Sequence, residues 1–263
     1  MDYDFIIIGA GSAGCVLANR LSADPSRKVL LLEAGPEDRN PWIHIPLGYG
    51  KNVSNSAVNW CFQSEPENEL YGQSYMLPRG KVIGGSSSIN GMVYVRGQKE
   101  DYNIWAQMGC TGWSYDDVLP YFRKAENNER GESDVHGAGG LLDVSDIKEQ
   151  GTICDAMVRA GMEIGLPYND DINSGDQEGI GPHQATIRDG RRASTAQAYL
   201  KPARQRPNLH IQPNATAYKV MFKGKKAVGV AYLKGNTPAE AQATCDVILC
   251  GGAFNSPQLL ELS

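Results

Sequence analysis

Two short apolar runs near the start of the chain bracket a stretch with helical periodicity. Residues 5–8 are apolar at every position, which predicts a strand buried on both faces, as in a parallel sheet. Residues 15–24 place their larger apolar side chains on one helical face, and Pro25 follows where that helix should end. A second buried strand is expected over residues 28–32. This order of strand, helix and strand is typical of an α/β fold.

The turn between the first strand and the helix is rich in glycine. Gly9, Gly11 and Gly14 follow the G-x-G-x-x-G spacing. In a dinucleotide site the first glycine permits a tight turn, the second lets backbone approach a pyrophosphate, and the third lets helix pack closely on strand. Glu33 lies 19 residues after Gly14 (33 − 14), where a carboxylate can accept hydrogen bonds from ribose hydroxyls. The combination predicts a dinucleotide site, and the acid at Glu33 disfavours NADP.

Apolar periodicity continues along the chain and predicts further strands and helices. Asp116 and Asp117 open a short amphipathic helix, and the polar stretch 127–140 after it is interpreted as a linker and domain boundary. Glycine and lysine between two apolar runs predict a β-hairpin over 218–233. The other expected elements are a strand at 141–146, a helix at 152–165, a strand at 209–213 and a core strand at 246–252.

Composition places the chain among ordinary globular proteins. Its 263 residues are 41% hydrophobic and 21% charged, ample for a packed core. A net charge of −5 without basic runs argues against nucleic acid as a partner. No run reaches the roughly 20 apolar residues that span a bilayer, so no transmembrane segment is expected. The N-terminus lacks the features of a secretory signal. The six cysteines include no C-x-x-C pair, which indicates reduced thiols and no metal site. The protein is therefore expected in the cytoplasm, either free or bound peripherally at the inner face of the membrane.

A second glycine cluster, residues 79–97, follows the long irregular segment 36–60. Its glycine and polar residues are Gly80, Gly84, Gly85, Ser86, Ser87, Ser88, Asn90 and Gly91. Backbone N–H groups and hydroxyls of such a segment can wrap a second part of a cofactor, and the interleaved apolar residues are unlike a flexible linker. A nicotinamide domain usually continues with another helix and strand after its acid, so the long irregular segment favours flavin over NAD.

These motifs resemble those of the glucose–methanol–choline (GMC) oxidoreductases, a family of FAD enzymes. The family's first signature is similar to residues 80–103 and its second to residues 251–263. The stretches GRRASTAQAYLKPARQRPNLHI and KKAVGVAYL also match the family's style. The resemblance covers essentially the whole chain and is strongest to the branch of choline dehydrogenases and acceptor-dependent alcohol dehydrogenases.

The resemblance implies a set of cofactor-binding positions. At the FAD pyrophosphate it implies Gly9, Gly11, Ser12, Ala13 and Gly14. Glu33 would contact the adenosine ribose, and the backbone of Ala217 the adenine. The flavin side would be lined by Val82, Gly84, Gly85, Ser86, Asn90, Gly91, Met92 and Val93, and a further cofactor-proximal turn by Gly252 and Ala253. Some members tether FAD through a histidine at the position of Ile89, so non-covalent FAD is expected here.

The resemblance also implies an activity whose general base is missing. In this family an alcohol CH–OH group is oxidised by hydride transfer to the flavin N5, with a histidine beyond the second signature as general base. The chain stops at Ser263, so it is expected to be a fragment without the catalytic histidine. None of its own histidines lies in a motif with a base partner, and no catalytic residue is assigned among His44, His136, His183 and His210.

The expected fold is α/β, with a Rossmann-like FAD-binding domain that carries an inserted, smaller substrate or cap region. The FAD-binding domain is placed at residues 1–126 and 207–263, and the incomplete cap region at 127–206. The expected function is FAD-dependent oxidation of choline or another primary alcohol, with oxygen, a quinone or another electron acceptor as second partner. Two alternatives stay open: a flavin- or nucleotide-binding module without alcohol oxidation, and an NAD dehydrogenase.

Overall fold

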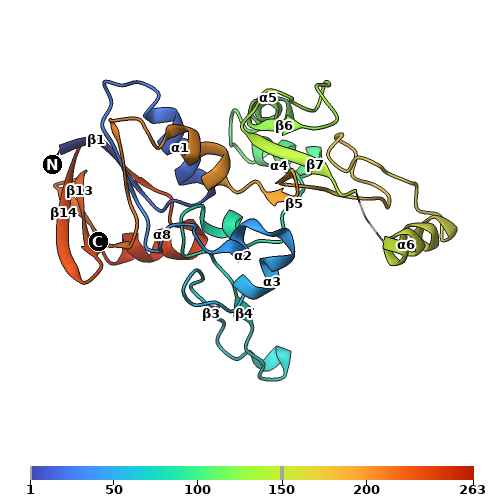
Figure 1. The fold of residues 1–263 in the computed structure, drawn as a ribbon, viewed down its shortest axis with the longest axis horizontal. Coiled ribbons are helices and arrows are strands. Elements are labelled where there is room, and N and C mark those ends of the chain that lie inside the picture. Colours follow the sequence, from blue (N-terminus) through green and yellow to red (C-terminus); the bar gives the residue numbers. More distant parts are fainter. Residues whose placement is uncertain (1, 149–150) are drawn as a thin grey trace. The chain divides into compact units, whose positions relative to one another are not determined.

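The computed structural model describes residues 2–148 and 151–263 as a mixed α/β protein (Figure 1). Contacts within the chain divide it into two compact units. The first, named the discontinuous unit, consists of Met1–Gly91 and Ser194–Ser263. The second, named the inserted unit, consists of Met92–Ala193.

A six-stranded sheet in the order β11-β2-β1-β14-β13-β12 forms the centre of the discontinuous unit. The first four strands in this order run parallel, whereas β13 pairs antiparallel with both β14 and β12. The predicted parallel strands and hairpin are confirmed, and β14 is longer than expected because its first half pairs with β13. The strands are β1 (Asp2–Ile8), β2 (Val29–Leu32), β11 (Leu209–Gln212), β12 (Ala215–Lys223), β13 (Lys226–Lys234) and β14 (Thr237–Leu249).

Apolar side chains of the central strands form the core around this sheet. Ile6, Leu31 and Val230 are fully buried, and β2 is buried at all four positions. A strand that is apolar at every position needs cover on both faces, which explains why these runs occupy the sheet centre. The helix α1 (Ser12–Leu21) packs on β1 and β2, and α8 (Gly252–Glu261) packs on β12.

Short elements make up the rest of the discontinuous unit. The irregular segment 36–60 contains α2, η1 and α3, and a two-stranded hairpin of β3 and β4 follows it. Within the second glycine cluster, four residues form a single helical turn, η3. The bounds are α2 (Pro41–His44), η1 (Pro46–Gly48), α3 (Tyr49–Asn52), β3 (Phe62–Gln63), η2 (Asn68–Leu70), β4 (Met76–Leu77), η3 (Gly85–Ser88), η4 (Ala196–Leu200) and α7 (Lys201–Ala203).

The inserted unit contains a four-stranded sheet in the order β5-β8-β7-β6. The strand expected at 141–146 and the helices expected after Asp116 and at 152–165 are confirmed as β7, α5 and α6. Its elements are β5 (Val93–Tyr94), α4 (Lys99–Gln107), α5 (Tyr115–Ala125), β6 (Glu126–Asn128), β7 (Leu142–Asp146), α6 (Gly151–Glu163), β8 (Gln184–Ala185), β9 (Ile187–Arg188) and β10 (Arg191–Arg192).

The two compact units meet in the sequence after Gly91 and after Ala193, whereas the expected domain boundaries were at residues 127 and 206. β5 pairs with β8 and β6 pairs with β7, so the segment 92–126 is hydrogen-bonded into the inserted unit. At the other boundary, Asn19 Nδ2 on α1 donates to Tyr199 O at 2.7 Å, which ties η4 to the discontinuous unit. Both boundaries depend on pairings between segments that are distant in the sequence.

The stretch 127–140 was expected to be a polar linker, but three of its residues, Asn128, His136 and Gly137, are buried in the inserted unit, while the others are exposed or half-buried. Glu126, immediately before it, is fully buried and accepts hydrogen bonds from Arg96 at 2.6 Å and from Asn128 Nδ2 at 3.0 Å. His136 is buried too, with Nδ1 3.0 Å from Glu126 Oε1. These polar residues are buried because they satisfy one another's hydrogen bonds.

The charges of this buried cluster reinforce one another. Burial raises the pKa of Glu126, but hydrogen bonds from His136 and Asn128 and the charge of Arg96 outweigh it and hold the pKa below its ordinary value. The hydrogen bond to Glu126 raises the pKa of His136 against the opposing effect of burial. His136 Nε2 also lies 2.8 Å from Asp171 Oδ2, so the imidazole lies between two carboxylates.

Candidate cofactor site

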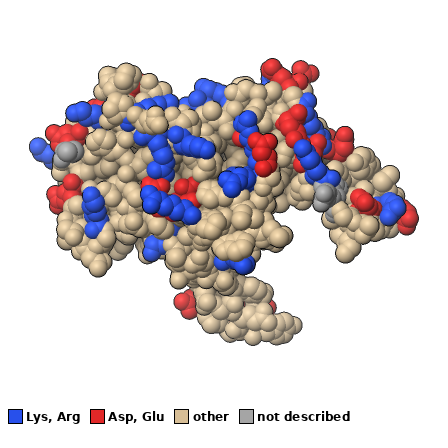
Figure 2. All heavy atoms as spheres, in the orientation of Figure 1, with Lys and Arg blue, Asp and Glu red and all other residues tan. Residues whose placement is uncertain are grey.

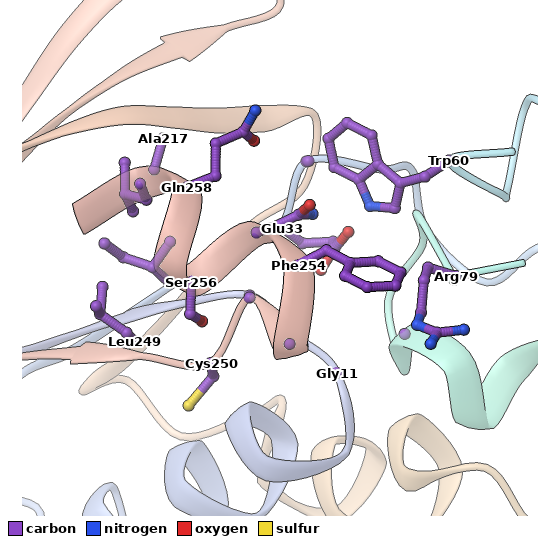
Figure 3. Close-up of a pocket in the computed structure, with 18 of the residues that line it drawn as sticks. Gly11, Glu33, Trp60, Arg79, Ala217, Leu249, Cys250, Phe254, Ser256 and Gln258 are labelled. Carbon is purple, nitrogen blue, oxygen red and sulfur yellow. The ribbon is translucent and has the colours of Figure 1, made fainter. Parts of the chain in front are cut away.

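A cavity of about 780 Å³ lies at the carboxyl edge of the parallel strands in the discontinuous unit (Figure 3). Ile8, Leu32 and Leu249, which are the last residues of β1, β2 and β14, all line this cavity. The first turns of α1 and α8 line it as well. Open parallel sheets bind their ligands in this position, outside the carboxyl ends of the strands.

Ten of the positions expected at the cofactor line this one cavity. They come from five separate stretches of sequence, which the fold brings together. These residues are Gly9, Gly11, Ser12, Ala13, Glu33, Gly85, Ser86, Ala217, Gly252 and Ala253. The expected nucleotide turn and the expected second glycine cluster are therefore neighbours in space.

Seven expected positions are not among the residues that line the cavity: Gly14, Val82, Gly84, Asn90, Gly91, Met92 and Val93. Gly14 packs against the carbonyl of Gly9, and Val82 is fully buried in a small apolar cluster. Met92 and Val93 belong to the inserted unit. The cofactor contacts expected at these seven positions, and at the ten that line the cavity, stay predictions.

The three glycines of the turn differ in what the protein's own packing requires of them. Gly9 has a φ of +102°, and a Cβ on it would overlap the carbonyl of Cys250. A Cβ on Gly14 would overlap the carbonyl of Gly9. Gly11 has an ordinary φ of −78°, and the atom nearest to a Cβ built on it is 3.9 Å away. The protein's own packing therefore does not require glycine here, and because Gly11 lines the cavity, its missing side chain leaves room for a ligand that approaches the backbone.

Glu33 is an acid of raised pKa in the cavity wall. Its side chain accepts hydrogen bonds from Ala10 N at 2.8 Å and Gly35 N at 2.9 Å, and the residue is only 5% exposed. Burial raises the pKa of Glu33 to about 7, because the two backbone N–H groups and the charge of Lys81 offset only part of the desolvation. The carboxyl group therefore changes charge near neutral pH.

Raising the pH from about 5 to about 8 should destabilise the wild-type chain relative to its Glu33→Gln variant by about 3 kcal/mol. The folded pKa of Glu33, about 7, lies above the ordinary value of 4.5, so between these values the folded state keeps a proton that the unfolded state has lost. Stability consequently falls as the pH rises through this interval. Urea unfolding of both proteins at the two pH values measures the difference, and any constant cost of the amide cancels. Parallel pH profiles would contradict the prediction.

Four residues that the sequence did not single out form another wall of the cavity: Trp60, Phe62, Arg79 and Phe254. The rings of Trp60 and Phe62 stack at 5.7 Å, and Phe254 meets Phe62 edge-on at the same centroid distance. Figure 3 shows Trp60, Phe254 and Arg79 grouped beside the cavity. The only sequence signal for these residues was that Arg79 is the first residue of the second glycine cluster and that Phe254 lies in the segment similar to the family's second signature.

The four histidines are all described, and none is among the residues that line this cavity. His44 and His210 form hydrogen bonds with other residues of the discontinuous unit. His136 belongs to the buried cluster of the inserted unit, and His183 lines a separate cavity there of about 260 Å³. No general base for the larger cavity is assigned among them.

Other classes of site find no counterpart in the parts of the chain that the structure describes. Those parts contain no group of three or more His, Cys, Asp or Glu side chains placed to hold a metal ion, and all six cysteines are free. None of their helices has the length and apolar character to cross a bilayer. Figure 2 shows basic and acidic side chains interspersed on the face in view.

Fold and cavity together define a Rossmann-like protein for a dinucleotide cofactor. A family model described as GMC oxidoreductase matches residues 3–263. The chain belongs to the GMC oxidoreductase family, and the resemblance inferred from its glycine motifs is confirmed.

Curated relatives match this chain over nearly its whole length. An alcohol dehydrogenase (acceptor) from Pseudomonas putida is 50% identical over 99% of this chain and 48% of its own length. A mitochondrial choline dehydrogenase from Homo sapiens is 47% identical over 100% of this chain and 45% of its own length. The chain therefore spans about half the length of the curated relatives it matches.

Solved structures share the fold at similar coverage. A pyridoxine 4-oxidase from Mesorbium loti superposes with a TM-score of 0.94 at 36% identity, over 98% of this chain and 51% of its own. An FAD-dependent oxidoreductase from Chaetomium thermophilum superposes with a TM-score of 0.91 at 32% identity, over 99% of this chain and 47% of its own. Family membership and these structures support FAD as the cofactor.

Proposed function

We propose that this chain provides the FAD site of an oxidoreductase that acts on the CH–OH group of choline or another primary alcohol. The observation that carries the proposal is the open approach to Gly11, at the carboxyl edge of the parallel strands and in a cavity of about 780 Å³. The relatives named choline and alcohol dehydrogenase support the choice of substrate class. The second partner is an electron acceptor such as oxygen or a quinone, and the location is cytoplasmic.

Different residues of the cavity fit different parts of the FAD molecule. The first turn of α1 would hold the pyrophosphate through the N–H groups of Ser12 and Ala13, because its cap residue Gly11 leaves those donors accessible. Glu33 would accept a hydrogen bond from the adenosine ribose, and Ala217 would meet the adenine through its backbone. Ile89 stands where some family members have a histidine, so the cofactor is held without a covalent bond.

The remaining expected contacts complete the proposal. The flavin side would involve Gly85 and Ser86 in the cavity wall, together with Val82, Gly84, Asn90, Gly91, Met92 and Val93. Gly252 and Ala253 at the start of α8 would lie against the cofactor too. The discontinuous unit would then be the FAD-binding domain, and the inserted unit would contribute to the substrate or cap region.

Each partner in the reaction has a distinct task. When bound, FAD supplies the two-electron acceptor for the hydride that leaves the alcohol carbon. The chain's own residues bind and orient the dinucleotide, and the aromatic wall of Trp60, Phe62 and Phe254 limits the access of water. Abstraction of the hydroxyl proton from the alcohol needs a general base. No residue that lines the cavity is assigned this role.

A visible absorption spectrum after incubation with FAD and gel filtration tests the cofactor. We expect the purified chain to retain the absorption bands of oxidised flavin and to release free FAD on denaturation. A colourless protein, or one that retained NAD instead, would overturn the proposal. The reaction is tested by mixing the natural full-length protein anaerobically with choline and with simple primary alcohols. Bleaching of the flavin bands is expected, and no bleaching by any alcohol would leave only the cofactor assignment standing.

A further inference from the structure

We propose that Arg79, stacked on Phe254, is a ligand for the pyrophosphate of the dinucleotide cofactor. The inference rests on the proposed FAD site and adds a cationic side chain to a set of expected cofactor-binding residues that contains no lysine or arginine. Three observations support it: the packing of glycine-containing segments, the charge of the cavity wall, and the way the guanidinium is held.

The second glycine cluster meets the glycine turn at the start of α1. A Cβ on Gly80 would overlap Gly85, and a Cβ on Gly85 would overlap the Cα of Gly11. The Gly80 N–H also donates to Ser86 Oγ at 3.1 Å. Because only glycine permits these contacts, the backbone of Arg79 is held beside the segment that opens α1 (Figure 3).

The cavity wall here suits a negatively charged group. The first turns of both α1 and α8 line the cavity, and helix N-termini carry partial positive charge. Neither first turn has an acidic residue or a side-chain cap among the described residues. Arg79 is the one lysine or arginine among the described residues that line the cavity, while the one acid, Glu33, already accepts two backbone hydrogen bonds. A doubly charged pyrophosphate would complement two helix ends and one guanidinium.

The guanidinium of Arg79 is positioned by an aromatic ring. Its Cζ lies 4.7 Å from the centroid of Phe254, and Nη1 donates to Pro78 O at 2.7 Å. The ion pairs found within residues 2–148 and 151–263 do not include Arg79. An arginine has five N–H donors in a planar fork, so donors remain for two phosphate oxygens. Stacking reduces the entropy lost when the side chain is ordered on binding.

Ligands with and without the pyrophosphate test the assignment directly. Dissociation constants are measured for FAD, for ADP, which has the pyrophosphate but no flavin, and for riboflavin, which has the flavin but no phosphate. Arg79→Gln should weaken FAD and ADP about tenfold or more and change riboflavin less than about twofold, because only the first two offer a charge-assisted acceptor. Arg79→Lys should recover part of the loss, and Phe254→Leu should produce a smaller loss of the same kind.

A matched control is Lys51→Gln, which removes another cation of the discontinuous unit. Lys51 lies over the ring of Trp42 at 3.8 Å and is not among the cavity-lining residues, so its variant should bind all three ligands as the wild type does. Unchanged FAD affinity in Arg79→Gln, or equal losses for FAD and riboflavin, would overturn this inference alone. A wild-type chain that bound none of the three ligands would overturn the proposed FAD site together with it.

Discussion

Gly11→Ala should weaken FAD binding about 100-fold, or about 2.7 kcal/mol, while the fold stays intact. The protein itself has room for the new methyl group, because the nearest heavy atom is 3.9 Å away and φ is −78°. The methyl group would instead occupy the space through which the pyrophosphate reaches the first turn of α1, at the expense of charge-assisted hydrogen bonds. Quenching of flavin fluorescence measures affinity, and thermal unfolding without ligand measures the fold.

Gly14→Ala is the matched comparison, since it adds the same methyl group three residues away. Here the Cβ would overlap the carbonyl of Gly9, so helix α1 must move away from β1. We expect a loss of about 4 kcal/mol of stability or more, as for other severe steric clashes in a core. Equal FAD affinity in Gly11→Ala and wild type would show that the cofactor does not approach this turn. Equal thermal destabilisation of both variants would show that Gly11 is structural.

Glu126→Gln should destabilise the folded chain by about 3–5 kcal/mol. The carboxylate is fully buried and accepts hydrogen bonds from Arg96, Asn128 and the backbone N–H of Gly137. Its loss leaves the buried guanidinium of Arg96 without a counter-charge, and the desolvation of that cation is then uncompensated. Urea unfolding followed by tryptophan fluorescence measures the effect, because Trp105 lies in the same unit.

An exposed ion pair of the same unit provides the control. Glu132 Oε1 lies 3.0 Å from Arg123 Nη2, with 72% of the glutamate side chain exposed. Glu132→Gln should change stability by less than about 1 kcal/mol, because solvent screens the pair. Similar losses of stability in Glu126→Gln and Glu132→Gln would mean that burial does not strengthen the ion pair between Glu126 and Arg96. A stable Glu126→Gln protein would mean that Arg96 finds another partner.

The expected fold class and much of the expected cofactor site came from local sequence patterns that few other structures can accommodate. The apolar run at 5–8 could be buried on both faces only in a sheet centre, and it forms β1. The hairpin at 218–233 follows from two apolar runs joined by a glycine turn, and Gly224 indeed has a φ of +62°. The positions expected at the cofactor came from two glycine clusters, from the spacing of Glu33 and from the family resemblance, and ten of those positions line one cavity.

Properties that depend on distant partners were outside the reach of local patterns. The polar stretch at 127–140 has the composition of a linker, but its Asn128 and His136 are buried because they hydrogen-bond to Glu126, which also pairs with Arg96. The boundaries of the compact units depend on β5 pairing with β8 and on the contact of α1 with η4, both between segments about 90 or more residues apart.

By itself, the sequence determined the kind of protein: an α/β fold with parallel central strands and a glycine turn for a dinucleotide, in the GMC oxidoreductase family. Strand burial and glycine geometry act over a few residues, so they can be read along the chain. Only the tertiary structure decided which side chains line the cavity and how burial changes their pKa values. Arg79 meets Phe254 across 175 positions of sequence (254 − 79), and Glu33 has a pKa of about 7 only because the folded chain removes it from water.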